Sequence, residues 1–358
     1  MKTAIVIGTR PEIIKLSPVI RELERKGGDY FILHTGQHYS YNLDRVFFEQ
    51  LRLPPTKYNL EVGSGSHAQQ TGRILIGVEN VLREERPDIV LVEGDTNSVL
   101  AGALAASKLH VKVGHVEAGL RSYDRRMPEE INRALTDHCS DYLFAPTKKA
   151  KAILQGEGIP DGKIFVTGNT IVDAVYQNLE IARETENSVG DLNLTPREYF
   201  LVTLHRPENV DDSARLASIL DGLSKVATEF HFPVVYPIHP RSRKMMTEFA
   251  LEPRNLTLIE PVDFLCFLQL EGNARLVLTD SGGVQEEACI HNVPCVTLRD
   301  NTERPETIEV GANILAGASA NKILECAQLM LGRQNRWANP FGDGKAGKRI
   351  VEILESVV

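Results

Sequence analysis

The sequence is poor in features that would tie it to an oxidising compartment or a membrane. Its 358 residues include five cysteines, an odd number with no CxxC spacing: Cys139, Cys266, Cys289, Cys295 and Cys326. Scattered thiols of this kind indicate a reducing compartment rather than a disulfide framework. The chain also shows no signal sequence and no apolar run long enough to cross a membrane. We therefore expect a cytoplasmic protein without membrane contact.

Motifs for metals, dinucleotides and P-loop chemistry are absent as well. The ten histidines show no HExxH and no paired ligand spacing. The turn Gly8-Thr9-Arg10, after the first predicted strand, lacks the GxGxxG fingerprint of dinucleotide binding. The stretch 342–348 nearly matches a P-loop, but Arg349 replaces the Mg²⁺-binding hydroxyl and no strand precedes it. The sequence therefore predicts no metal and no cofactor.

Length and composition indicate a globular protein of two domains. A chain of 358 residues is too long for one typical core and suits two domains of about 150–200 residues. Hydrophobic residues make up 42% and charged residues 25%, as in globular proteins. The net charge of −8 argues against non-specific nucleic-acid binding. Cations placed locally could still hold an anionic ligand.

Short apolar strands alternate with helical segments through both halves, which predicts an α/β fold. The strand 2–7 ends at Thr9-Arg10-Pro11-Glu12, and the strand 199–204 ends at His205-Arg206-Pro207-Glu208. This repetition suggests two similar βα halves that each offer an edge to one cleft. The polar run 184–197 lacks periodicity and reads as the approach to the second half. With a hinge near Gly168, the predicted domains are 1–168 and 169–343.

One turn has the geometry of an anion site. The apolar run 275–278 precedes Thr279-Asp280-Ser281-Gly282-Gly283, and a helix is expected to follow. A strand, a small-residue turn and a helix point backbone N–H groups and the positive end of a helix dipole at an anion. One turn into that helix, Glu287 could accept hydrogen bonds from two sugar hydroxyls. An ordinary capped turn is the alternative interpretation.

A second set of polar residues follows strand ends in the first half. Asp95 and Glu117 come just after successive strands, and Glu129 follows Met127-Pro128. A single acid there is often only a helix cap, but three together favour a proton-handling cluster. Arg10 on the first turn and Lys15 one helical turn later could face the same edge, where open α/β sheets bind ligands.

With these turns in view, the sequence resembles the non-hydrolysing UDP-N-acetylglucosamine 2-epimerases. The resemblance runs nearly end to end, in order, through segments 8–12, 36–38, 94–96, 114–121, 128–133, 205–209, 280–287, 302–306 and 339–344. It implies the glycosyltransferase-B architecture, in which two Rossmann-like domains face each other across a cleft. It also implies that the C-terminal helix, 344–358, returns to the first domain, and that the protein is a homodimer.

The resemblance implies roles for particular residues. Ser281, Gly282 and Gly283 would hold the diphosphate of UDP, Glu287 the ribose hydroxyls, and Arg304 with Arg10 the phosphate charge. Asp95, Glu117, Glu129 and His205 become the catalytic candidates, with Lys15 nearby. Bacterial members bind UDP-GlcNAc at an effector site as well, which points to Gln37, His38 and Gln70. Gln69-Gln70 stands where an Arg-Gln pair is common, so that site is predicted to be altered.

The chemistry of this family suits the residues present. The C2–H of the sugar is not next to a carbonyl, and no nicotinamide site exists to oxidise the ring. Elimination of UDP across C1–C2 to 2-acetamidoglucal, followed by re-addition, interconverts UDP-GlcNAc and UDP-ManNAc. That route needs a stabilised diphosphate leaving group and proton carriers on both faces of the ring. The product commonly enters polysaccharide biosynthesis in this family.

Three other functions remain open. A glycosyltransferase of the same architecture would share the UDP site but needs an acceptor groove, and the three acids argue against it. A hydrolysing epimerase would release free ManNAc and UDP. A non-catalytic sensor of nucleotide sugars would keep the 281–287 turn and Arg304, but it would not need Asp95, Glu117 and Glu129 together.

Overall fold

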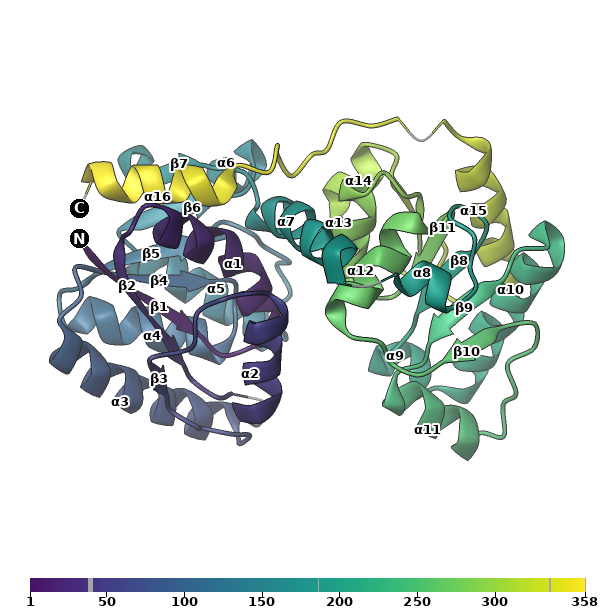
Figure 1. Ribbon diagram of the computed structural model, residues 1–358, viewed down its shortest axis with the longest axis horizontal. Helices are drawn as coiled ribbons and strands as arrows, with labels where there is room; N and C mark the ends of the chain where they lie inside the picture. The colour runs from purple at the N-terminus through teal and green to yellow at the C-terminus, as the bar shows by residue number, and fades with distance from the viewer. Residues whose placement is uncertain (38–40, 186, 335, 358) are drawn as a thin grey trace. The chain divides into compact units, whose positions relative to one another are not determined.

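The computed structural model describes residues 1–37, 41–185, 187–334 and 336–357. It divides into two compact units, which we call unit 1 (Met1–Gln177 with Phe341–Val358) and unit 2 (Asn178–Pro340). Each unit is a parallel sheet flanked by helices (Figure 1). This arrangement confirms the predicted α/β class.

The sheet of unit 1 has seven parallel strands in the order β3-β2-β1-β4-β5-β6-β7 among the residues described. Their bounds are β1 Lys2–Ile7, β2 Asp29–His34, β3 Tyr58–Asn59, β4 Ile89–Glu93, β5 Lys112–Val116, β6 Tyr142–Ala145 and β7 Ile164–Val166. The strand order reverses between β1 and β4, and such a reversal opens a crevice at the carboxyl ends of the strands. The turns that carry Arg10 and Asp95 follow these two strands.

The strands of unit 1 are apolar because helices cover both faces of a parallel sheet. All five residues of β4 are buried, including its last residue, Glu93. The helices are α1 Arg10–Arg25, α2 Tyr41–Gln50, α3 His67–Glu85, α4 Asn97–Lys108, α5 Pro128–Cys139, α6 Lys148–Gly156, α7 Thr170–Thr185 and α16 Ala346–Val357, with a 3₁₀ turn at Asp161–Lys163.

The sheet of unit 2 has six parallel strands in the order β10-β9-β8-β11-β12-β13 within the described ranges. They are β8 Phe200–Thr203, β9 Val234–Pro237, β10 Thr257–Ile259, β11 Leu276–Thr279, β12 Cys295–Thr297 and β13 Asn313–Leu315. The helices are α8 Ser188–Asp191, α9 Pro207–Val210, α10 Ser213–Phe230, α11 Pro240–Glu248, α12 Phe264–Asn273, α13 Gly282–Ile290, α14 Pro305–Glu309 and α15 Ala320–Gly332. The order reverses between β8 and β11, so the His205 and Ser281 turns lie at this crevice.

The C-terminal helix belongs to unit 1. Figure 1 shows α16 lying beside α1, and Gly347 comes so close to Pro18 that a Cβ at Gly347 would be 2.9 Å from the Pro18 carbonyl carbon. Asp173 accepts hydrogen bonds from the N–H groups of Ala346 and Gly347, at 3.1 and 3.0 Å, and so satisfies the first turn of α16. The boundary between the units falls inside α7, whose Gln177 accepts a hydrogen bond from Arg21 of α1.

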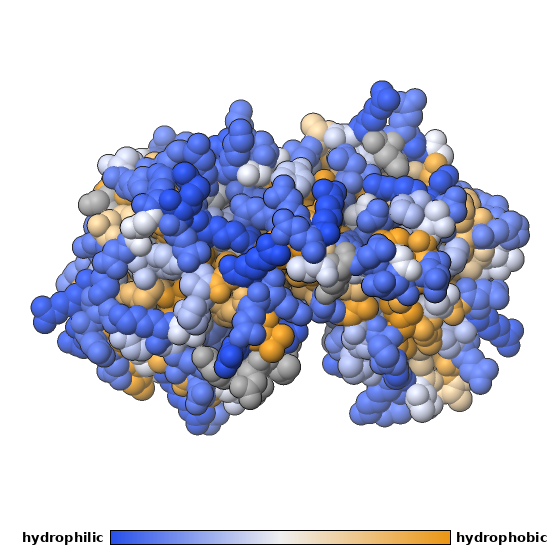
Figure 2. Space-filling view, in the orientation of Figure 1, coloured by the Kyte–Doolittle hydropathy of each residue, from blue (hydrophilic) through white to orange (hydrophobic). Residues whose placement is uncertain are grey.

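The face of the molecule drawn in Figure 2 is predominantly polar. Figure 2 shows hydrophilic residues over most of the face in view, with apolar residues in separate smaller patches. Within the described ranges, no helix combines the length and the apolar character needed to cross a bilayer.

Candidate active site

Asp95 follows β4 and is held by α5. Arg133 pairs with the Asp95 carboxylate and also binds Glu130 at 2.8 Å. The side-chain amide of Asn132 donates to the Asp95 carbonyl at 3.0 Å. The Asp95 side chain remains 33% exposed, so it is fixed in position yet accessible. Glu129 lies in the first turn of α5, only partly buried, and the same contacts bring that turn toward Asp95.

Glu117 follows β5 in a backbone conformation that few residues other than glycine adopt. Its φ is 66°, and such strain in a non-glycine residue is typical of functional sites. Lys15 donates to the Glu117 carboxylate at 2.5 Å, and the Asn169 amide donates to its other oxygen at 3.1 Å. Lys15 also lies 3.2 Å from Glu93. The structure therefore brings the predicted residues Lys15 and Glu117 together and adds Glu93 to them.

A buried polar network positions the turns that carry Asp95 and Glu117. Asp137 of α5 lies 2.7 Å from His115 Nδ1 and accepts from the Gly119 N–H at 3.2 Å. His115 Nε2 lies 2.9 Å from the Gly94 carbonyl oxygen. Each ring nitrogen of His115 therefore faces an oxygen atom that accepts hydrogen bonds. The network therefore ties the turns at Gly94 and Gly119 to one carboxylate.

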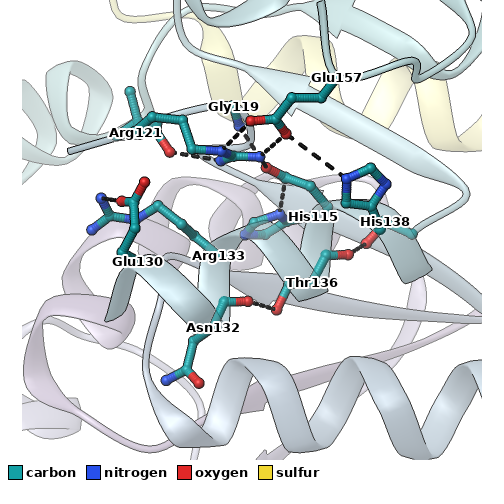
Figure 3. A network of polar contacts seen from close by, with 12 residues as sticks. His115, Gly119, Arg121, Glu130, Asn132, Arg133, Thr136, His138 and Glu157 are labelled. Carbon is teal, nitrogen blue, oxygen red and sulfur yellow. Dashed lines mark hydrogen bonds and ion pairs between the residues drawn. The ribbon is translucent and has the colours of Figure 1, made fainter. Parts of the chain in front are cut away.

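Arg121 completes this network. It binds Asp137 at 2.7 Å on one side and Glu157 at 2.6 Å on the other, and Figure 3 shows it beside α5 with His115. Burial raises the pKa of Asp137, but His115 and Arg121 outweigh burial, so its pKa lies below the usual value. Asp137 is consequently an anion whose role is to hold its neighbours in place.

The first turn of α1 carries Arg10 and Glu12. The Arg10 guanidinium lies 5.6 Å from the centre of the Phe47 ring, a distance at which cations stack on aromatic faces. Glu12 is buried and accepts from the Gly8 N–H at 2.5 Å and from the Thr96 hydroxyl at 2.6 Å. Burial raises the pKa of Glu12 from 4.5 to about 7. Glu12 thus joins the turn after β1 to the turn after β4.

In unit 2, Asp280 joins the two predicted turns. It is fully buried and accepts from the backbone N–H groups of His205 and Arg206 at 3.0 and 2.9 Å. His205 Nδ1 lies 3.3 Å from the same carboxylate, and the His205 side chain is 41% exposed. Ser281 follows directly and caps α13 without a side-chain hydrogen bond to the helix. His205 and Ser281 both line a pocket of about 190 Å³, together with His239, Pro261, Val262 and Phe267.

Glu287 and Arg304 each face a buried glutamate. Glu287 faces Glu271 of α12, and burial, together with the charge of Glu287, raises the pKa of Glu271 well above its usual value. Arg304 Nε lies 3.0 Å from Glu286. Gly282 and Gly283 leave the start of α13 open, because a Cβ at either position would meet no atom closer than 3.7 Å. The predicted diphosphate residues thus border free space.

The predicted effector residues serve the fold where the structure describes them. Gln37 accepts from the Ser98 hydroxyl at 2.6 Å. Gln70 donates to the carbonyls of Gln37 and Gly63, both at 3.0 Å, and accepts from Asn97 at 2.7 Å. His38 lies outside the described residues. An effector role for these three residues stays a prediction.

Comparison with known proteins identifies the family. A family model described as UDP-N-acetylglucosamine 2-epimerase matches residues 21–355. The UDP-N-acetylglucosamine 2-epimerase of Methanocaldococcus jannaschii is 58% identical, over 99% of this chain and 99% of that relative. The chain belongs to the UDP-N-acetylglucosamine 2-epimerase family. The resemblance predicted from the sequence is therefore confirmed.

Solved and more distant members of the UDP-N-acetylglucosamine 2-epimerase family extend this result. A crystal structure of the M. jannaschii UDP-GlcNAc 2-epimerase in complex with UDP-GlcNAc and UDP covers 99% of this chain and 100% of that one, with a TM-score of 0.89. It confirms the predicted glycosyltransferase-B architecture. The UDP-2,3-diacetamido-2,3-dideoxy-D-glucuronate 2-epimerase of Pseudomonas aeruginosa is 45% identical over 99% of both chains.

Reasoning from the sequence assigned no role to five residues that contact the predicted site residues or the turns that carry them in this UDP-N-acetylglucosamine 2-epimerase family member: Glu12, Glu93, Arg133, Asp280 and Glu271. One signal was available for Glu93, because a charged residue closes an otherwise apolar buried strand. Glu271 carries no comparable signal, since only packing of α12 against α13 brings it to Glu287. Among the described residues no group of His, Cys, Asp and Glu side chains could hold a metal ion.

Proposed function

We propose that this protein interconverts UDP-GlcNAc and UDP-ManNAc by inverting C2 of the amino sugar, without a cofactor. The observation that carries the proposal is the similarity, over 99% of the chain, to a 58% identical epimerase whose crystal structure holds UDP-GlcNAc and UDP. The residues of each unit supply the chemistry that this reaction needs.

The reaction runs through an elimination and an addition. A carboxylate takes the proton from C2, the C–H electrons form the C1=C2 double bond, and the C1–O bond breaks with its electrons on the diphosphate. The products are UDP and 2-acetamidoglucal. A phosphate oxygen of UDP then adds to C1 while C2 receives a proton on its other face. Nothing is oxidised or lost, so no cofactor is required.

Unit 2 supplies the binding site for the nucleotide in this proposal. The N–H groups at the start of α13 and the small residues Ser281, Gly282 and Gly283 suit the diphosphate. Arg304 supplies positive charge, and Glu287 accepts hydrogen bonds from the ribose hydroxyls. The side chains of Pro261, Val262 and Phe267 give the pocket an apolar part that suits the uracil ring. Arg10 of unit 1 adds charge for the phosphates.

Unit 1 supplies proton carriers. Asp95 and Glu117 follow β4 and β5, Glu129 lies in the first turn of α5, and Lys15 binds Glu117. In unit 2, the exposed His205 ring can bind or protonate the leaving phosphate. A correctly placed general acid or base contributes about 10²–10⁴-fold in rate.

The decisive experiment is NMR of UDP-GlcNAc incubated with the pure protein in D₂O, without added cofactor or acceptor. We expect UDP-ManNAc with deuterium at C2. Asp95→Asn should lose C2 exchange by about 10²-fold or more and still bind UDP. Free ManNAc would indicate hydrolysis, and unchanged turnover of Asp95→Asn would contradict the proton role.

The name of one relative suggests a second candidate substrate. The 45% identical relative from P. aeruginosa epimerises UDP-2,3-diacetamido-2,3-dideoxy-D-glucuronate, according to its name. This sugar also carries an acetamido group at C2, so the same elimination would serve it. The NMR assay should therefore be repeated with it, and a ratio of kcat/KM values in its favour would reassign the substrate.

We further propose a homodimer in the cytoplasm that provides precursors for polysaccharide biosynthesis. Large apolar side chains are exposed on α5 and α3, at Ile131, Leu135 and Ile76. Ile131 and Leu135 lie one helical turn apart, so they share a face of α5. The free cysteines suit a reducing compartment.

A further inference from the structure

Glu93 is a buried acid for which the proposed reaction has no assigned use. It is the last residue of β4, and its side chain is 2% exposed. Lys15 Nζ of α1 lies 3.2 Å from its Oε1 and 2.5 Å from Glu117 Oε2. Glu117 directly follows β5, the strand that pairs with β4 beside Glu93. One ammonium group therefore serves two buried carboxyl groups.

The charges around Glu93 do not balance if both carboxyl groups are ionised. The charged or titratable groups facing Glu93 are Lys15 and Glu12 of α1 and Glu117 after β5. With Glu93 and Glu117 both ionised, Lys15 would leave one negative charge uncompensated in a buried site, which is costly.

The two members of the pair differ in their surroundings. Glu117 receives hydrogen bonds from Lys15 and from the Asn169 amide, and both favour its ionised form. Glu93 Oε1 accepts no hydrogen bond from the described residues. Burial raises the pKa of Glu93 well above its usual value, although Lys15 opposes this, and Glu117 raises it further. The proton therefore resides on Glu93.

We propose that Glu93 is a positioning residue whose carboxyl group stays protonated and donates a hydrogen bond to Glu117, so that the two act as a single carrier of one proton. The expected effect on turnover rests on the proposed function, whereas the protonation of Glu93 does not. The carboxylate of Glu117 is then held by three donors, Glu93, Lys15 and Asn169, in one orientation toward its substrate. On the alkaline side, loss of the Glu93 proton sets two anions against each other and disrupts this arrangement.

Infrared spectroscopy of the full-length protein tests the protonation directly. Glu93→Gln should remove the absorption of one protonated carboxyl group at neutral pH. Glu252→Gln is the matched control, because Glu252 is exposed and should contribute nothing to that absorption. An unchanged spectrum for folded Glu93→Gln would overturn the proposal. This readout needs no activity, so it stands even if the protein turns over neither nucleotide sugar.

The pH dependence of turnover tests the coupling to Glu117. Glu93→Ala should lower kcat by about 10²-fold, because Glu117 loses a donor and its orientation. Glu93→Gln should recover most of that loss, since its amide can donate the same hydrogen bond. It should also abolish the alkaline fall of kcat that the pair causes in the unmodified protein. An identical alkaline limb in both proteins would overturn the proposal, and circular dichroism checks that each variant is folded.

Discussion

At the scale of single residues, buried carboxyl groups in unit 1 ionise differently because their partners differ. Asp137 lies between His115 and Arg121, and its interactions with both lower its pKa despite burial. Glu12 receives hydrogen bonds from a backbone N–H and a hydroxyl, and burial raises its pKa to about 7. The first group stabilises the fold as an anion, and the second does so as a neutral acid.

Removal of Asp137 should be severely destabilising. Asp137→Ala leaves His115 and Arg121 buried without their carboxylate, which costs about 3–5 kcal/mol. Glu157→Ala is the matched control, because Glu157 binds the same Arg121 but its side chain is 30% exposed. Such pairs contribute about 1 kcal/mol or less. Urea unfolding measures both, and equal losses would contradict the prediction.

Glu12 should make stability depend on pH. Its folded-state pKa is about 7 against a usual 4.5, so its stabilisation is complete below 4.5 and is lost as the pH rises through about 7. The loss is on the order of 3 kcal/mol. Glu12→Gln cannot ionise, so its free energy of unfolding should fall less over this range. Urea unfolding between about pH 4 and pH 8 measures the difference, and parallel curves would refute it.

At the scale of secondary-structure elements, helix ends and close helix contacts depend on glycine. Gly283 lies in the first turn of α13, where a Cβ would meet no atom closer than 4.0 Å. Gly283→Ala should therefore fold normally, and alanine even favours the helix by about 1 kcal/mol. If the diphosphate approaches this turn, the methyl group blocks it, and the Kd for UDP should rise about tenfold or more. Calorimetry measures the Kd for UDP of Gly283→Ala and of the unmodified protein. An unchanged Kd would mean that the phosphates bind elsewhere.

A glycine-to-alanine substitution at Gly347 should destabilise the contact between α16 and α1. A Cβ at Gly347 would lie 2.9 Å from the carbonyl carbon and the Cβ of Pro18, so Gly347→Ala must push the helices apart. Such overpacking costs about 1–3 kcal/mol. Gly72→Ala in α3 is the control, because a Cβ there meets nothing within 4 Å. Thermal unfolding should show a lower Tm only for Gly347→Ala.

At the scale of the whole molecule, each unit carries its own share of the proposed chemistry. Unit 2 joins the His205 and Ser281 turns through Asp280, and unit 1 joins Lys15, Glu93 and Glu117. Nucleotide binding and proton transfer should therefore respond to different substitutions. The exposed apolar face of α5 is a separate feature, since Asn132 and Arg133 contact Asp95 while Leu135 is 51% exposed.

Self-association should depend on that apolar face. Leu135→Glu places a charge where an interface would bury it, so the proposed homodimer should dissociate. The monomer itself should stay folded, because Leu135 is exposed. Sedimentation velocity compares the variant with Leu329→Glu, an equally exposed leucine on α15 of unit 2. Equal dimer content in the two variants would place the interface elsewhere.

The sequence by itself determined the α/β class, the family and the turns at which polar residues gather. These properties are local, because strand periodicity, turn chemistry and helix starts are written in consecutive residues. Asp95, Glu117 and Ser281 could be selected for that reason, since each lies within two residues of the end of a strand.

Only the tertiary structure decided which of these residues act together. Glu117 meets Lys15 across 102 residues of chain, and Asp280 meets His205 across 75. Such pairs depend on strand order and on the packing of helices over a sheet, which no local pattern specifies. The protonation of Glu93 also depends on tertiary structure. It follows from burial beside a second carboxyl group, which comes from the end of the neighbouring strand.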